Sequence, residues 1–119
     1  SGLAKGNKVP ARLLTQIITK AAGGEGGSAG RTLIADLPVA ALDGTLDKRL
    51  HDTTAAGTVR AKTGTLPQTS SLAGVVTTAD GRQLAFAVMT NDFSKDHTPA
   101  VEAAIDSHFV APLASCGCS

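Results

Sequence analysis

Three successive segments with a repeat period of two, between residues 58 and 90, limit the fold of this chain more than any other feature. In the first, which starts at Thr58, small or apolar residues alternate with polar ones. The second covers Ser71–Thr78 and the third covers Gln83–Thr90. Residues 79–81, Ala-Asp-Gly, predict a tight turn, and Pro67 lies between the first two segments, outside any strand ladder. Consecutive strands with short connections predict a three-stranded antiparallel meander.

The region before the strands predicts an amphipathic helix followed by a loop. Over residues 10–22 apolar side chains recur at helical spacing, with Pro10 in the first turn and a Gly-Gly pair after the end. Residues 23–30 contain five glycines in eight positions, a composition that predicts a flexible surface loop. Short helices are then expected at 31–37, before Pro38, and at 46–51, after an Asp-Gly-Thr turn.

A further helix is expected after the last strand. Thr98 is a suitable N-cap, Pro99 suits the first helical position, and apolar residues then follow helical spacing to about Pro112. A helix that arrives after the last strand can cover one face of the sheet. The predicted fold class is therefore α+β, with a three-stranded antiparallel meander and a covering C-terminal helix.

The supply of core-forming side chains is small. Apolar residues make up 42% of the 119 residues, but 20 of them are alanine and only 28 are Val, Leu, Ile, Met or Phe. Because small domains bury a modest share of their surface, the chain is expected to pack against more protein. The net charge of +1 and the absence of Trp and Tyr exclude nucleic-acid binding by bulk charge or base stacking. No apolar run is long enough for a transmembrane helix.

Histidine and cysteine show no metal-ligand spacing. His51, His97 and His108 are far apart in the sequence and are expected to be solvated or on a helix face, so no metal site is predicted. Cys116 and Cys118 are interpreted as two tail thiols without a role. The other interpretation is a bridge to a cysteine of another chain or segment.

The segment with the most chemistry is 60–66, Arg-Ala-Lys-Thr-Gly-Thr-Leu. Strand alternation sends Lys62 and Gly64 to one face and Thr63 and Thr65 to the other, and edge twist can bring them around one groove. Gly64 admits a ligand closely, while the ammonium and hydroxyl groups suit the carboxylate of an extended peptide added to the strand edge. The Thr65 N–H is a candidate oxyanion donor. The other interpretation is an exposed strand with solvated side chains.

Lys-Thr-Gly is also the third motif of serine acyl-transfer enzymes of the penicillin-binding and class A β-lactamase type. Together with its surroundings, the sequence resembles the low-molecular-mass class C penicillin-binding proteins, the D-alanyl-D-alanine carboxypeptidase/endopeptidase family. The further segments that carry the resemblance are Ser1-Gly2-Leu3-Ala4 with Asn7, Leu37-Pro38-Val39-Ala40, Asp43-Gly44-Thr45-Leu46 with Arg49, and Leu72-Ala73-Gly74-Val75 with Thr77-Thr78.

The resemblance implies that residues 1–119 are the C-terminal part of a penicillin-binding, β-lactamase-like transpeptidase domain. No serine of this sequence has Lys three positions on or Asn two positions on, so the nucleophile motif Ser-x-x-Lys and the Ser-x-Asn motif are expected in a missing N-terminal part. The implied activity is a serine carboxypeptidase acting on peptidoglycan stem peptides through an acyl-enzyme, outside the cytoplasm and without a cofactor. The expected partners are stem peptides, β-lactams and the missing part.

In the family scheme, the site residues of this chain are Lys62, Thr63, Gly64 and Thr65, and the chain by itself is expected to be inactive. The alternative is a folded binding or assembly module without catalysis. Ser28 also stands in a Gly-x-Ser-x-Gly pattern, 26–30, which resembles a hydrolase nucleophile elbow. That motif needs a strand before it, whereas here a predicted helix precedes it, so we interpret these residues as part of the glycine-rich loop.

Overall fold

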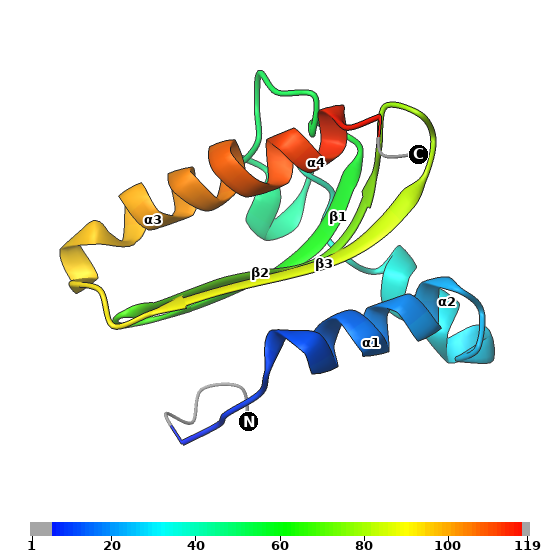
Figure 1. The fold of residues 1–119 in the computed structure, drawn as a ribbon, viewed down its shortest axis with the longest axis horizontal. Helices are drawn as coiled ribbons and strands as arrows, with labels where there is room; N and C mark the ends of the chain where they lie inside the picture. Colours follow the sequence, from blue (N-terminus) through cyan, green and yellow to red (C-terminus); the bar gives the residue numbers. More distant parts are fainter. Residues whose placement is uncertain (1–5, 118–119) are drawn as a thin grey trace.

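The three predicted strands form one antiparallel sheet in the computed structural model, which describes residues 6–117 (Figure 1). The strands are β1 (Val59–Leu66), β2 (Thr69–Thr77) and β3 (Gln83–Asn91), in the order β1-β2-β3. The meander is therefore confirmed. β2 begins two residues earlier than predicted because Pro67 and Gln68 alone form the turn, with Gln68 at a φ of 66°.

Helices lie on both sides of this sheet (Figure 1). Helix α1 (Ala11–Ala22) confirms the amphipathic helix and contacts β3 most extensively among the strands. The predicted loop over 23–30 is wrong in its second half, because α2 (Gly27–Ala35) begins inside it. The glycines there serve packing between the two helices: a Cβ atom on Gly30 would lie 3.1 Å from the Cα atom of Ala21. The predicted helix 31–37 is thus the second half of α2, and α2 ends two residues early.

The segment between α2 and β1 is mostly turns. A short 3-10 helix, η1 (Gly44–Leu46), stands where the turn was expected, and the predicted helix over 46–51 is wrong. Leu50 has a φ of 62° and Asp52 a φ of 56°, values that a right-handed helix does not allow. Leu50 adopts this backbone while its side chain is buried in the core.

The C-terminal helix, residues 98–115, consists of α3 (Thr98–Ala104), a π-helical segment η3 (Ile105–Val110) and α4 (Ala111–Ser115), preceded by the 3-10 turn η2 (Lys95–His97). Thr98 is the first helical residue and its hydroxyl donates to the Lys95 carbonyl, so it is not the predicted N-cap. The helix passes the predicted end at Pro112 and continues to Ser115, with Pro112 as the second residue of α4, directly after the π-helical segment.

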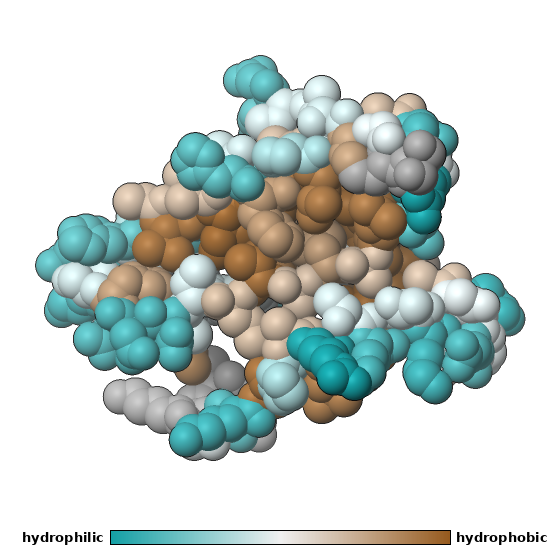
Figure 2. Space-filling view, in the orientation of Figure 1, coloured by the Kyte–Doolittle hydropathy of each residue, from teal (hydrophilic) through white to brown (hydrophobic). Residues whose placement is uncertain are grey.

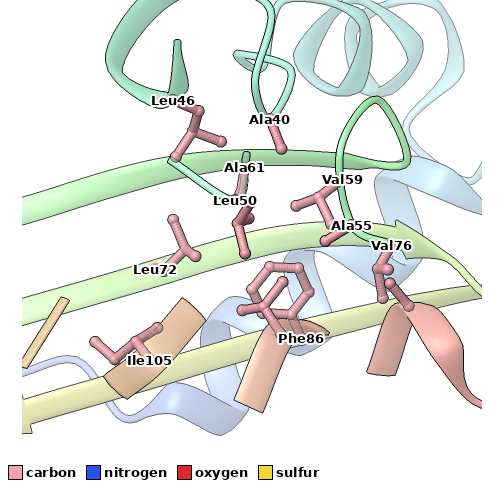
Figure 3. Close-up of a cluster of buried hydrophobic side chains, with 12 residues drawn as sticks. Ala40, Leu46, Leu50, Ala55, Val59, Ala61, Leu72, Val76, Phe86 and Ile105 are labelled. Atoms are coloured by element: carbon pink, nitrogen blue, oxygen red, sulfur yellow. The ribbon is translucent and has the colours of Figure 1, made fainter. Parts of the chain in front are cut away.

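The main core lies between the C-terminal helix, the 39–58 segment and one face of the sheet (Figure 3). Strand register places alternate residues of all three strands on this face, which we call the helix-98 face. Its buried residues are Ala40, Leu46, Leu50, Ala55, Val59, Ala61, Leu72, Val76, Phe86, Ile105, Val110 and Ala114. The opposite face, which we call the α1 face, carries Lys62, Gly64 and Ser71.

A salt bridge connects the C-terminal helix to the segment before β1. The Arg49 guanidinium donates to both carboxylate oxygens of Asp106, at 3.0 Å and 2.5 Å. Both side chains are largely buried, with 13% and 15% of their area exposed.

At the other end of the sheet, the Thr78 hydroxyl donates to the Asp80 carboxylate and lowers the pKa of Asp80, which stabilises the predicted turn between β2 and β3.

Two further features concern the C-terminal cysteines and the length of the helices. Cys116 is disulfide-bonded, so the interpretation as two free thiols is wrong, and Cys118 lies outside the described residues. Within residues 6–117, none of the helices has the length and apolar character needed to cross a membrane.

Candidate functional site

The outer edge of β1 differs between its two halves. Along the first half, the chain segment at Val39 forms a bridge with Arg60. The Ala61 N–H donates to the Pro38 carbonyl and the Val59 carbonyl accepts from the Ala40 N–H, each at 3.0 Å. Within the described residues this coverage stops before Lys62. By strand alternation, the backbone N–H and C=O groups of residues 63 and 65 therefore point to an open edge.

Lys62 lies on the α1 face at the start of this open half. Its ammonium group donates to the Thr63 carbonyl at 2.8 Å and lies 3.4 Å from the Thr63 hydroxyl. The lysine side chain therefore bends over the strand edge and brings its charge to the Thr63 backbone. The side chain of Lys62 is exposed and available to a ligand.

The need for glycine at position 64 is explained by Ser71, a residue that the sequence motifs did not indicate. The Ser71 hydroxyl, on the neighbouring strand, donates to the Gly64 carbonyl at 3.2 Å. A Cβ atom on Gly64 would lie 2.5 Å from this hydroxyl oxygen, too close for a normal contact. Glycine at this position therefore leaves room for the Ser71 side chain, and close approach of a ligand stays a prediction.

Thr65 is held from the other face of the sheet. Its hydroxyl donates to a carboxylate oxygen of Glu102, in α3, at 3.0 Å. Thr63 and Thr65 thus lie as predicted, on the face opposite Lys62, but only the Thr63 hydroxyl lies near the ammonium group. Sequence analysis missed Glu102 because 37 residues separate it from Thr65, and no local pattern marks a single glutamate on an amphipathic helix.

The four predicted site residues line one groove. It has a volume of about 1110 Å³ and is bounded by the β1–β2 hairpin, the end of β3, the start of α1 and the segment before it. Apolar side chains, among them Leu14, Leu66 and Met89, stand beside polar groups in its wall. The groove opens beside the uncovered half of β1, so an extended peptide could pair with the strand edge and reach the ammonium group of Lys62.

Other candidates do not form sites. Ser28 lies within α2, and the element directly before it is the helix α1 and not a strand, so the nucleophile-elbow pattern is a coincidence of glycine-rich sequence. His51, His97 and His108 are all exposed. Across residues 6–117, no three His, Cys, Asp or Glu side chains are grouped as a metal site.

Comparison with known proteins identifies the family. The family model described as D-Ala-D-Ala carboxypeptidase 3 (S13) matches residues 1–111, and the chain belongs to this family. It is 43% identical to carboxypeptidase DacB of Mycolicibacterium smegmatis over 122 residues, which cover 99% of this chain and 25% of that protein. It is 39% identical to a D-alanyl-D-alanine carboxypeptidase of Actinomadura sp. over 112 residues, which cover 88% of this chain and 20% of that protein.

Solved structures agree with the family and with the fold. Penicillin-binding protein 4 of Haemophilus influenzae, complexed with a β-lactam, matches 92% of this chain with a TM-score of 0.75 and 28% identity. The match covers 27% of that chain. The predicted family and the α+β fold of its C-terminal part are therefore confirmed. The chain spans about a quarter of the length of the relatives it matches.

Proposed function

We propose that residues 1–119 form the C-terminal part of a serine D-alanyl-D-alanine carboxypeptidase that cleaves peptidoglycan stem peptides and binds β-lactams. Membership of the S13 family, the names of the relatives and the β-lactam complex of a structural neighbour support this activity. Such an enzyme acts outside the cytoplasm, and the disulfide-bonded state of Cys116 is consistent with an oxidising compartment.

The observation that carries the proposal is the open half of β1 beside the Lys62 ammonium group. An extended peptide that ends in D-Ala-D-Ala lies along this edge as an added strand. Lys62 then attracts the terminal carboxylate, and Thr63 supplies a hydroxyl near the same charge. The Thr65 N–H, which strand alternation directs to the open edge, donates to the oxyanion that forms during attack on the peptide carbonyl.

The nucleophile comes from outside this sequence in our proposal. A serine activated by a lysine attacks the carbonyl of the penultimate residue, its proton passes to the leaving amine, and D-alanine is released. Water then hydrolyses the ester. This scheme requires no metal or organic cofactor. The missing part also packs against β3, which has no strand partner on its outer side within residues 6–117.

Apolar surface along β3 supports such a neighbour. Figure 2 shows apolar side chains gathered between the C-terminal helix and α1, over the β3 side of the sheet. Two exposed apolar side chains of these elements are Met89, in β3, with 40% of its area exposed, and Phe109, in the C-terminal helix, with 38%. Surface of this kind is usual where another part of a protein binds.

Intact-mass spectrometry after incubation with penicillin tests the proposal. We expect one covalent adduct per molecule of the complete protein and none on residues 1–119 alone. In the complete protein, Lys62→Ala is expected to slow acylation by about 100-fold or more. Lys48→Ala is the matched control, because Lys48 is an exposed lysine outside the groove, and it should leave the rate unchanged. An adduct on the isolated chain, or normal acylation of the Lys62 variant, would contradict the proposal.

A further inference from the structure

Glu102 is joined to the proposed site through one hydrogen bond. On the helix-98 face, its carboxylate accepts a hydrogen bond from the Thr65 hydroxyl, with 3.0 Å between the two oxygen atoms. The Thr65 N–H points to the open edge of β1. We infer that Glu102 is a positioning residue of the acylation step, which fixes Thr65 so that its N–H meets the developing oxyanion. This inference rests on the proposed function and extends it to a residue outside the Lys-Thr-Gly motif.

Thr65 needs such a contact because of where it lies in the strand. It is the second-last residue of β1, followed by Leu66 and the two-residue turn at Pro67. The bridge from the 38–40 segment covers only the first half of the strand, so no neighbour holds the outer edge at Thr65 within the described residues. Pairing with β2 on one side and the Glu102 contact on the helix-98 face therefore hold this end of the strand.

Glu102 is itself held in place. The backbone carbonyl of Glu102 accepts a hydrogen bond from the Arg49 guanidinium at 3.4 Å. Asp106, one helical turn further on, forms the largely buried salt bridge with the same guanidinium. The helix turn that carries Glu102 is thus fixed against the segment before β1, and this is the segment that covers the first half of the strand edge.

The opposite face of the strand has a corresponding contact. The Ser71 hydroxyl donates to the Gly64 carbonyl from the α1 face. Residues 64 and 65 are therefore held from both faces of the sheet by side chains of other elements. The Ser71 contact constrains the inner, β2-facing side of the strand, whereas the Glu102 contact constrains the residue whose N–H faces the ligand.

The consequence is a specific kinetic pattern. An oxyanion donor acts on the transition state and contributes little to ground-state binding, so a displaced Thr65 N–H lowers the acylation rate constant and leaves non-covalent binding nearly unchanged. A purely structural role for Glu102 would lower stability and leave the rate constant of folded molecules unchanged. The two roles therefore differ in a measurement that is independent of stability.

The test uses the complete protein with a chromogenic β-lactam, and separates the acylation rate constant from the dissociation constant of the initial complex. Glu102→Ala is expected to lower the rate constant about tenfold and to change the dissociation constant less than about twofold. Glu102→Gln keeps an acceptor oxygen at the same reach and should stay within about threefold of wild type. Glu25→Ala serves as the matched control, because Glu25 is the other glutamate of the chain, is exposed, and is not among the residues that line the groove.

A double-mutant cycle identifies the contact. In a Thr65→Val background, which lacks the hydroxyl, Glu102→Ala should cause no further loss of rate. Equal tenfold losses in both backgrounds, or wild-type acylation by Glu102→Ala, would overturn the inference. If Glu102→Ala does not fold, Glu102→Asp replaces it, and a wild-type rate constant for Glu102→Asp would also overturn the inference. A wild-type protein that forms no adduct overturns the proposed function, and this inference with it.

Discussion

The two faces of the sheet differ in how completely they are packed. On the helix-98 face, Leu72 and Val76 have no exposed area and Phe86 has 3%. On the α1 face, the covering helix leaves Leu13 and Ile17 with 44% and 47% of their area exposed, although both belong to its apolar stripe. The same sheet therefore has one face, called the sealed face below, whose core residues are buried within this chain, and one face, called the open face, whose covering helix stays partly exposed.

The difference teaches which side stabilises this chain and which side is available for function. The sealed face contains the main core, whereas the Lys62 ammonium group, the Ser71 hydroxyl and most of the strand residues that line the groove lie on the open face. A groove needs exposed polar groups and unfilled space, and both reduce the stability that packing provides. Because packing for stability and the exposed groups of the groove lie mainly on opposite faces, one strand, β1, contributes to both the core and the groove.

The largest expected effect comes from Gly74, where β2 passes close to β1 on the sealed face. A Cβ atom on Gly74 would lie 2.0 Å from the Arg60 carbonyl oxygen and 2.6 Å from the Cα atom of Ala61. Gly74→Ala must therefore move one strand, and we expect a loss of more than about 3 kcal/mol in the free energy of unfolding. Denaturant unfolding measures this loss. Gly6→Ala is the control, because a Cβ atom there has open space, and an equal loss in both variants would refute the explanation.

Truncating one isoleucine on each face tests the comparison directly. Ile105 has 5% of its area exposed and belongs to the core, whereas Ile17 has 47% exposed. Ile105→Ala should cost about 3 kcal/mol in the free energy of unfolding, because it leaves a cavity. Ile17→Ala in residues 1–119 should cost about 0.5 kcal/mol or less. Similar losses for the two variants would show that the α1 layer is packed as tightly as the sealed face.

The Arg49–Asp106 salt bridge lies on the sealed side and should matter more than an exposed charge. Arg49→Ala leaves the largely buried Asp106 carboxylate without its bidentate partner. We expect a loss of about 2 kcal/mol in the free energy of unfolding, measured by thermal or denaturant unfolding. Arg12→Ala, an exposed arginine on α1, should change stability by about 0.5 kcal/mol or less. A negligible loss for Arg49→Ala would show that apolar packing alone holds the C-terminal helix in place.

The smallest effects are expected at two adjacent serines of β2 that face opposite sides. The Ser70 hydroxyl is fully buried on the sealed face and has no hydrogen-bond partner among residues 6–117, whereas the Ser71 hydroxyl donates to the Gly64 carbonyl. Ser70→Ala should therefore stabilise the chain by about 0.5–1 kcal/mol, and Ser71→Ala should destabilise it by a similar amount. Equilibrium unfolding of the pair provides the measurement, and changes of the same sign would contradict this account.

Local sequence patterns predicted the regular strands and helices, and they failed where contacts with distant parts of the chain determine the backbone conformation. The alternation in 58–90 and the apolar spacing in 10–22 are properties of neighbouring residues, so the three strands and α1 were predicted nearly to their ends. The glycine-rich segment was misread, because the helix there depends on contact between Gly30 and Ala21. The backbone at Leu50 was also missed, since burial of its side chain compensates for an unfavourable φ.

The sequence by itself determined the meander, the family motif at Lys62–Gly64 and the identity of the family, because these depend on residue order and short-range alternation. Only the tertiary structure decided which half of β1 is open. It also decided that Ser71 occupies the space over Gly64, and that Glu102 meets Thr65. The bridge at Val39 and the Glu102 contact join elements that are distant in the sequence, and their geometry follows from how the C-terminal helix and the 38–50 segment pack together on the sheet. The Ser71 contact follows from the register of the β1–β2 hairpin.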